Sequence, residues 1–449
     1  MTGPSEDVGI RICYVLDFLP TYVVREAAGV ALAGMTPGIH LPVESLSDGL
    51  WERVLADGTI PLGSPPCRDL RKDWCTAPAG RLLREALPPV AALFAAHPVR
   101  FAGLALASLR DGTFRYFLAG AELAARLGED GADLLHAHFA RDAAHIALHA
   151  AALLGVPFTV TTHATDIFSP EDPGRVATLL RRAAGIHTIS EYNRGYMADR
   201  YGGGLSDRIM VSRLGLDAAE LPSRTAPRPG GTPSFACTAS GLVPKKGVEV
   251  LFEACRILRS RGVSFACSVL GSDPGGTRLA SLGRMASDMG LDGIVSLPGL
   301  LPSGEVLARV SGCTAFVLPA VAAPNGDMDG IPVALMEAMA MGVPSISTRM
   351  SGIPELIEDG ANGLLVAPGD PEALASAMER LSSDPQLAGA LGSAGRETVL
   401  SRFSIDRYVS ELVSFWEDVL GAHHGASGDR GGSRGVPADG PKTPDGRIR

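Results

Sequence analysis

The chain has 449 residues, enough for about two or three domains, and 46% of them are hydrophobic, which is ample for several cores. Charged residues make up 20% of the chain and the formal net charge is −9, which argues against a nucleic-acid binder with its basic surface. The 54 glycines follow no period, so collagen-like and repeat architectures are excluded as well.

Elements that alternate between strand and helix are predicted along most of the chain. The first part has a buried strand over residues 9–18, a helix over 22–32, loop-rich residues 36–80 and about three helices over 81–128. Strands over residues 133–137, 157–162 and 185–190 then alternate with helices over 142–154, 175–184 and 191–201. This alternation predicts a parallel sheet with helices on both faces.

The second part repeats the alternation after a Pro- and Gly-rich stretch, residues 219–233, that predicts a linker. We therefore predict an α/β fold of two doubly wound domains facing across a cleft, over residues 8–218 and 234–402. A helix over residues 403–421 is expected to pack back on the first domain. Residues 422–449 have almost nothing to bury and are expected to be disordered. Ligands in such sheets bind outside the carboxyl ends of the strands.

The cysteines and the apolar segments predict a compartment. The seven cysteines are scattered and form no CxxC pair, which favours buried thiols in a reducing cytosol over disulfides or a zinc site. The N-terminal residues lack the features of a signal peptide, and the longest apolar region, residues 86–109, is broken by prolines and charges. We expect a cytoplasmic protein in which this region is a packed helix pair; the alternatives are peripheral contact with the inner membrane face, or a cover over an acceptor cleft.

The most informative stretch is DMDGIPVALMEAMAMG, residues 327–342. It places Asp329 and Glu337 on either side of a glycine, a proline and a short apolar helix, between two predicted strands. Such a unit aims backbone N–H groups and carboxylates at whatever lies beside the helix start. A phosphate with a polyhydroxy neighbour suits that position, because carboxylates accept hydrogen bonds from sugar hydroxyls.

Five segments resemble, in order, the retaining glycosyltransferases of the two-Rossmann-domain (GT-B) type, in the large group called glycosyl transferases group 1, or family 4 type. They are HAHFA (136–140), GVPFTVTTHATDIF (155–168), LVPKKG (242–247), DGIPVALMEAMAMGVP (329–344) and SGIPELIEDGANGLLV (351–366). The resemblance covers roughly residues 8–420 and implies two Rossmann-like domains. It looks nearest to members that build exopolysaccharide repeats or glycosylate small natural products.

The resemblance implies a donor site on the second domain. Lys246 matches the family lysine that grips the donor diphosphate, and Glu337 matches an acid that accepts hydrogen bonds from the nucleotide ribose. The Gly330 and Ile331 amides are expected to face the phosphate. Pro332 suits the first helical position.

Two positions depart from the family pattern. Asp329 stands where the family usually has a glutamate, which is one methylene longer. Gly241 stands where the family usually has a phosphate-binding arginine, so either another base such as Lys245 substitutes for it or donor binding is reorganised.

On the first domain, His163 follows a predicted strand and matches a family histidine that faces the reacting sugar. Together with Lys246 and Asp329 it is a candidate catalytic residue. Acceptor-side candidates are His138, Asp166 and Thr21; Thr21, with Tyr22 and Glu26, resembles an N-terminal acceptor-side motif of some relatives. No metal site is predicted, since the helical pair of His145 and His149 lacks a third ligand, and the Asp327–Asp329 pair lies in a segment that resembles metal-independent enzymes.

The predicted function is that of a hexosyltransferase that moves a sugar from a nucleotide-diphosphate donor, expected to be a UDP-sugar, to a hydroxyl with retention of configuration. The expected acceptor is a carbohydrate, an aminocyclitol or a lipid-linked molecule, in exopolysaccharide or antibiotic biosynthesis, and no cofactor or nucleic acid is expected. The alternatives are a phosphorylase or sugar-nucleotide epimerase of the same fold, and a non-catalytic partner subunit.

Overall fold

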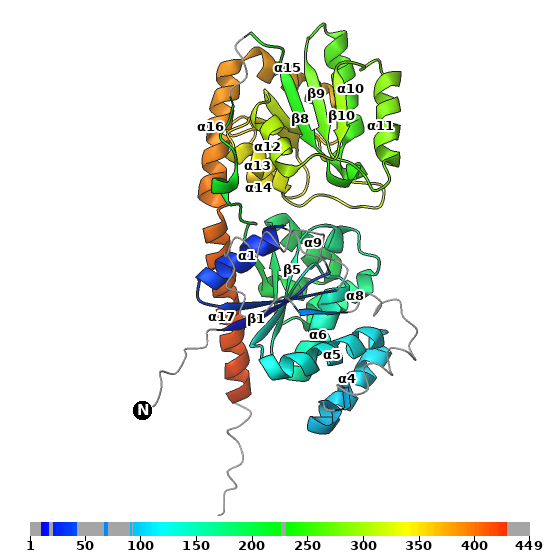
Figure 1. The fold of residues 1–449 in the computed structure, drawn as a ribbon, viewed down its shortest axis with the longest axis vertical. Coiled ribbons are helices and arrows are strands. Elements are labelled where there is room, and N and C mark those ends of the chain that lie inside the picture. The colour runs from blue at the N-terminus through cyan, green and yellow to red at the C-terminus, as the bar shows by residue number, and fades with distance from the viewer. Residues whose placement is uncertain are drawn as a thin grey trace, which may run out of the picture.

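The computed structural model describes residues 10–17, 21–42, 67–70, 90–91, 93–225 and 230–428. Two parallel β-sheets, each with helices packed against it, form a lower N-terminal lobe and an upper C-terminal lobe (Figure 1). This arrangement confirms the predicted pair of doubly wound α/β domains. Predictions for residues 43–66 and 71–89 lie outside the described residues.

The N-terminal sheet has the strand order β3-β2-β1-β4-β5-β6-β7. Strands β2 and β3 therefore lie on one side of β1, and β4 to β7 follow one another on the other side. Its strands are β1 (Arg11–Val15), β2 (Thr36–Pro42), β3 (Cys67–Leu70), β4 (Leu134–His138), β5 (Phe158–Thr162), β6 (Gly185–Thr188) and β7 (Ile209–Val211). Its helices are α1 (Thr21–Leu32), α4 (Pro98–Arg110), α5 (Phe114–Asp130), α6 (Asp142–Leu154), α7 (Thr165–Phe168), α8 (Pro173–Arg182) and α9 (Glu191–Tyr201). Since all strands are parallel, the loops after β1, β4 and β5 meet at one edge of the sheet.

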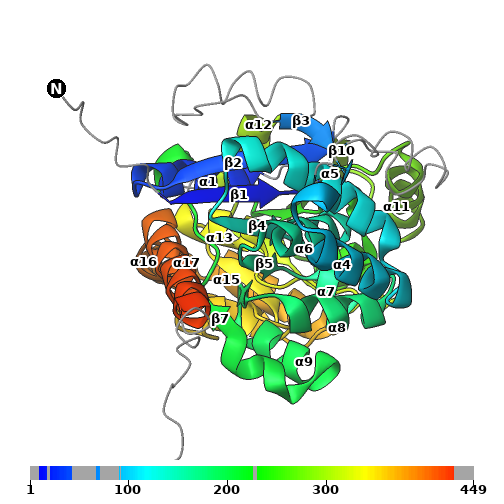
Figure 2. The same ribbon diagram turned by 90° about the horizontal axis from the view of Figure 1, so that it is seen from below.

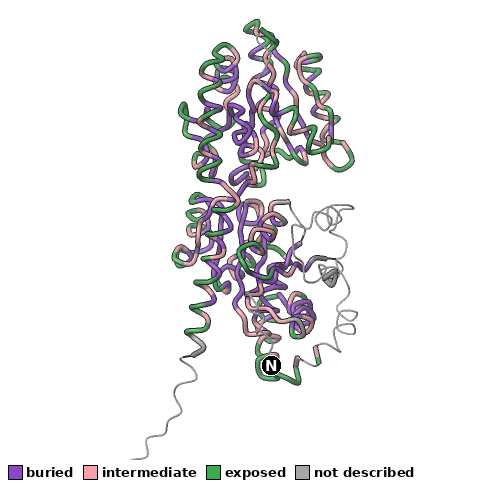
Figure 3. Tube along the Cα trace, turned by 60° about the vertical axis from the view of Figure 1, so that its left-hand side comes forward, coloured by how far each residue is buried: buried purple, intermediate pink, exposed green. Residues whose placement is uncertain are grey.

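The C-terminal sheet has the strand order β10-β9-β8-β11-β12-β13 and is also parallel. Its strands are β8 (Ser234–Thr238), β9 (Ala266–Leu270), β10 (Val295–Gly299), β11 (Ala315–Leu318), β12 (Ser345–Thr348) and β13 (Leu364–Val366). Its helices are α10 (Val248–Ser260), α11 (Thr277–Asp288), α12 (Ser303–Ser311), α13 (Val333–Ala340), α14 (Ile353–Leu356), α15 (Pro371–Ser383) and α16 (Pro385–Arg402). Buried segments gather in the centre of each lobe (Figure 3). The loops after β8 and β11 meet at the edge of the sheet that faces the other lobe.

The last helix, α17 (Ile405–Gly428), returns to the N-terminal lobe and lies along one side of its sheet, opposite α4 and α5 (Figure 2). Trp416 and Tyr408 are buried there, and Phe415 packs where Gly185 leaves no Cβ; an added Cβ would lie 2.6 Å from the Phe415 ring. The helix continues to Gly428, past the predicted start of a disordered tail at residue 422. Extending a formed helix costs far less than starting one, so its exposed end stays helical beyond the packed part.

Residues 98–110, which include the end of the broken apolar region, form α4, and this helix packs on α5 through the rings of Phe101 and Phe117, 5.0 Å apart. Among the described residues, no helix combines the length and the apolar character needed to cross a bilayer. The five cysteines whose side chains are described are all buried: Cys13, Cys237, Cys255, Cys267 and Cys313.

The side chain of Glu355 on α14 joins the two lobes. Its carboxylate accepts the backbone N–H groups of Glu191 and Tyr192, at 3.2 and 3.0 Å, at the start of α9 in the other lobe. Arg213 donates to the same carboxylate at 3.3 Å. A C-terminal side chain therefore caps an N-terminal helix, where a negative charge is favoured by the helix dipole.

We predict that Glu355→Ala destabilises the protein by about 1–3 kcal/mol, because two helix N–H groups and one guanidinium lose their acceptor. The lobes should also separate more readily, which small-angle scattering would show as a larger radius of gyration. The matched control is Glu358→Ala, an exposed glutamate on the same segment. An unchanged melting temperature and radius of gyration in Glu355→Ala would contradict this role of Glu355 in joining the lobes.

Candidate active site

The loop between β11 and α13 carries the acidic motif to the seam between the lobes. Pro332 is the N-cap of α13, one position earlier than the predicted first helical position. At the other end of this helix, Arg396 and Arg224 donate to the carbonyl oxygens of Ala340 and Gly342. Cations at the carboxyl end of α13 complement the helix dipole. The positive, amino end of α13 faces the motif loop.

Two lysines and two aspartates form a compact charged cluster beside that loop. The Lys246 ammonium lies 2.7 Å from Asp329 Oδ2, and the Lys245 ammonium lies 3.0 Å from Asp327 Oδ2 and 3.5 Å from Asp329 Oδ1. The lysine turn is held by Gly247, whose φ is 67° and whose added Cβ would overlap the carbonyl oxygen of Pro319. The carboxylates that have the spacing of a metal motif are thus bound by ammonium groups.

The motif loop is braced by a serine that sequence reasoning missed. The Ser351 hydroxyl donates to the carbonyl oxygens of Asp329 and Gly330, and Ser351 itself has a left-handed φ of 43°. Such a conformation is costly for a serine, so the surrounding contacts must hold it. The sequence signal is the Ser-Gly pair at the start of SGIPEL, which precedes a helix and offers a hydroxyl for the neighbouring loop.

Glu337 is a partly buried carboxylate without a hydrogen-bond partner among the described groups. Burial raises its pKa, and Arg25 of α1 in the other lobe lowers it in part. Arg25 is itself paired with Glu220. A desolvated acid with unused acceptor atoms at the lobe interface is ready to accept hydrogen bonds from a ligand.

Gly330 allows the two lobes to come close together, in addition to leaving room for a ligand. A Cβ added to it would lie 3.0 Å from the Ile189 side chain and 3.1 Å from the carbonyl oxygen of His163. Thr165, two residues after His163, receives a hydrogen bond from Lys245 at 3.3 Å and donates to Asp327 at 3.4 Å. His163 and the charged cluster therefore lie on either side of one seam, with Ile331 buried beside it.

The acceptor-side predictions need correction. His138 is 1% exposed, and both its ring nitrogens are occupied, by Glu26 and by His163, each at 3.1 Å. Asp166 is equally buried, and its carboxylate accepts the N–H groups of Ala140, His163 and Ala164. Both side chains lie behind His163 and hold it: His138 bonds the His163 ring, and Asp166 of α7 accepts the His163 backbone N–H.

The remaining predicted positions fall as follows. Thr21 is the first residue of α1, and its side chain lies outside the described side chains. His145 and His149 are buried in packing contacts, against the Tyr116 ring and the Thr113 hydroxyl respectively. Gly241 has a left-handed φ of 69°, which glycine tolerates and arginine does not.

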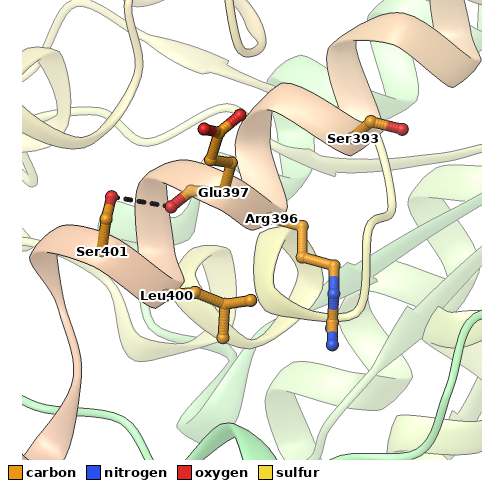
Figure 4. A pocket seen from close by; sticks show the side chains of 5 residues that line it. All are labelled: Ser393, Arg396, Glu397, Leu400 and Ser401. Atoms are coloured by element: carbon orange, nitrogen blue, oxygen red, sulfur yellow. Dashed lines mark hydrogen bonds between the residues drawn. The ribbon is translucent and has the colours of Figure 1, made fainter.

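A surface hollow lies away from this site. It measures about 530 Å³ and is lined by five residues of the single helix α16: Ser393, Arg396, Glu397, Leu400 and Ser401 (Figure 4). Arg396 is engaged with α13, and the Ser401 hydroxyl bonds the Glu397 carbonyl. No group in this hollow is arranged for chemistry.

Comparison with known proteins bears on the whole chain. Residues 74–220 match the family described as Glycosyltransferase Family 4, and residues 223–398 match Glycosyl transferases group 1. These two matched segments lie in the N-terminal and C-terminal lobes, respectively. The chain is 38% identical over 214 residues to the putative colanic acid biosynthesis glycosyltransferase WcaL of Salmonella typhimurium. This alignment covers 47% of this chain and 52% of that protein.

Two further similarities are more distant. The 2-deoxystreptamine glucosyltransferase of Streptomyces kanamyceticus is 26% identical, over 61% of this chain and 73% of that protein. The crystal structure of Anabaena HepE in complex with UDP-glucose superposes with a TM-score of 0.65 at 17% identity, over 90% of this chain and 99% of that one. The latter shows a shared fold. The chain spans about half the length of the first curated relatives it matches.

Proposed function

We propose that this protein is a hexosyltransferase that uses a nucleotide-sugar, with the donor nucleotide and diphosphate on the C-terminal lobe and the acceptor on the N-terminal lobe. The observation that carries the proposal is that the lobe interface holds both the Lys246 ammonium, bound to Asp329, and the desolvated Glu337 of α13, which has no hydrogen-bond partner among the described groups. One supplies a cation for a diphosphate, and the other supplies acceptors for a ribose.

The residues at the seam have distinct roles in the proposed reaction. The incoming diphosphate takes the Lys246 ammonium from Asp329, and that cation stabilises the charge that builds on the leaving phosphate. Asp329 is then free to accept a hydrogen bond from a donor-sugar hydroxyl. His163 contacts the transferred sugar from the other lobe, and closure of the seam limits hydrolysis of the donor by water.

We infer retention of configuration from the five motif segments, which resemble retaining enzymes. In this mechanism the acceptor hydroxyl attacks on the face that the phosphate leaves, and the departing phosphate takes its proton. We also infer independence of metal ions, because Lys245 and Lys246 occupy the carboxylates that a divalent cation would require. A UDP-sugar donor is supported by the UDP-glucose complex of HepE. The names of WcaL and the 2-deoxystreptamine enzyme support a polysaccharide or aminocyclitol acceptor.

The test is a panel of UDP-, GDP- and ADP-sugars incubated with the full chain, with release of nucleotide as the readout. We expect release from a UDP-sugar that accelerates with a hydroxyl acceptor, that persists in a chelator, and that yields the retained anomer by NMR. A requirement for inorganic phosphate would indicate a phosphorylase. Conversion of the donor without acceptor would indicate an epimerase, and absence of nucleotide binding would indicate a partner subunit.

A further inference from the structure

A buried chain of hydrogen bonds runs from the C-terminal helix to His163. The Tyr408 hydroxyl donates to Glu26 Oε2 at 2.6 Å, and Glu26 Oε1 lies 3.1 Å from His138 Nε2. His138 Nδ1 lies 3.1 Å from His163 Nε2. Glu26, His138 and Tyr408 are at most 1% exposed, whereas His163 at the end of the chain is 7% exposed.

The direction of the first bonds follows from the charge on Glu26. Burial raises the pKa of Glu26, but interaction with His138 and hydrogen bonds from His138 and Tyr408 outweigh it, so the pKa lies below its ordinary value. An ionised carboxylate can only accept hydrogen bonds. His138 must therefore carry its proton on Nε2, facing Glu26.

The remaining proton positions follow in turn. With its proton on Nε2 only, His138 has a lone pair on Nδ1 and can only accept there, so His163 Nε2 donates. Burial, with His138 and His187 adding to it, lowers the pKa of His163 well below its ordinary value, so this ring is neutral. The His163 Nδ1 atom is then a lone pair. No described group bonds it, and it is not among the buried atoms that lack a partner, so it is open to the seam.

We propose that Glu26 is a positioning residue that acts through His138 to fix the tautomer of His163, so that His163 Nδ1 accepts a hydrogen bond from a hydroxyl of the bound sugar. The identity of that hydroxyl rests on the proposed function; the tautomer does not. The general principle is that the hydrogen bond at one ring nitrogen of a histidine sets what the other nitrogen offers.

A metal ion is the competing use of the same residues, since ligand atoms of Glu26, His136 and His138 lie within 4.8 Å of one another. Every ring nitrogen in that group already has a partner, however. His136 bonds the Thr159 and Thr161 hydroxyls at 2.8 and 2.9 Å, and His138 bonds Glu26 and His163. A cation would have to break these bonds, so the hydrogen-bonded arrangement is the better use of the cluster.

The adjacent layer of buried histidines provides a matched control. His187 Nε2 bonds the Ser212 hydroxyl at 2.8 Å, and His187 Nδ1 bonds Thr161. Ser212 is as buried as His138, but its hydrogen bond leads away from Glu26. Ser212→Ala therefore removes a buried hydrogen bond of the same kind without touching the path to His163.

The test is ¹⁵N NMR of the ring nitrogens in the full chain labelled with ¹⁵N-histidine, with His163→Asn used to assign the signals. In the unaltered protein, we expect His163 Nδ1 to resonate as a lone-pair nitrogen and Nε2 as an N–H nitrogen. In Glu26→Gln the carboxamide can donate to His138 Nε2, so the His163 signals should shift toward the opposite tautomer. Glu26→Asp, still acceptor-only, should retain the original pattern, and so should Ser212→Ala.

Turnover provides the second readout. Glu26→Gln should lower kcat by about 10- to 100-fold with the donor KM changed less than about twofold, and Ser212→Ala should change neither. A His163 that carries its proton on Nδ1 in the unaltered protein would overturn the proposal, even if Glu26→Gln failed to fold. So would an unchanged tautomer in folded Glu26→Gln. If the tautomer shifts as expected but no sugar is transferred, the action of Glu26 on His163 is confirmed and the proposed function is contradicted.

Discussion

Lys246→Ala is expected to lower turnover of the nucleotide-sugar by about two to three orders of magnitude, the range measured when one stabilising group of a transition state is removed. The ammonium of Lys246 lies 2.7 Å from Asp329 Oδ2 and is 15% exposed, so it acts in a poorly screened setting. Its loss removes the cation that we propose for the departing phosphate. The measurement is nucleotide release under saturating donor, together with UDP affinity by calorimetry.

Two controls separate loss of the cation from incidental damage. Arg309→Ala removes an exposed cation of the same lobe, paired with Glu305 on α12, and should leave turnover unchanged. Lys246→Ala also leaves Asp329 with Lys245 alone, at 3.5 Å, and an uncompensated carboxylate could itself repel a diphosphate. Lys246→Ala combined with Asp329→Asn removes that repulsion. Recovery of UDP affinity in the double variant would contradict a direct role for Lys246.

The architecture could be predicted from the sequence because its signal is local. Strands of a parallel sheet are buried on both faces and read as short apolar runs, and the helices between them have their own periodicity. The length of α17 was not predictable in this way. Its last turns have no core to fill, so they depend on continuation of the helix from the part that packs under Trp416 and Tyr408.

Three of the candidate residues were predicted from positions that follow strands, whereas Glu337 was predicted from its place in the helix of the acidic motif. Lys246, Asp329 and His163 come after β8, β11 and β5, and the carboxyl ends of parallel strands place them at the seam. The contacts of Glu26 and Glu355 could not be found in this way. Glu26 meets His138 across 112 residues and Tyr408 across 382, and Glu355 caps a helix of the other lobe. Such partners are set by packing, which no local pattern encodes.

The same limit explains the two corrected residues. Polar side chains at or shortly after strand ends, such as His138 in β4 and Asp166 in α7, read in sequence as cleft-facing groups. The packing of α1 over the first and the turn of residues 163–166 around the second bury them behind His163. Their contribution is to orient His163, and substitutions there should act on the reaction through that ring.

Glu337→Gln is expected to weaken UDP binding while making the unliganded protein more stable. Loss of charge-assisted hydrogen bonds to the ribose corresponds to about 1.5–3 kcal/mol, or roughly 10- to 100-fold in affinity. Burial raises the pKa of Glu337 above its ordinary value of 4.5, and Arg25 offsets this only in part. An acid with a raised folded-state pKa contributes its full stability below the unfolded pKa and loses it as pH rises through the folded pKa.

At pH 7.5 the unaltered protein therefore bears the cost of a desolvated carboxylate, and Glu337→Gln does not. Its melting temperature should exceed that of the unaltered protein at pH 7.5, and the difference should shrink toward pH 4, where Glu337 is protonated in both folded and unfolded chains. Glu397→Gln, an exposed site on α16, should change neither stability nor affinity. A gain in stability together with a loss of UDP affinity identifies Glu337 as a ligand-binding acid. If Glu337 were structural, Glu337→Gln would lower the stability of the protein and leave its UDP affinity unchanged.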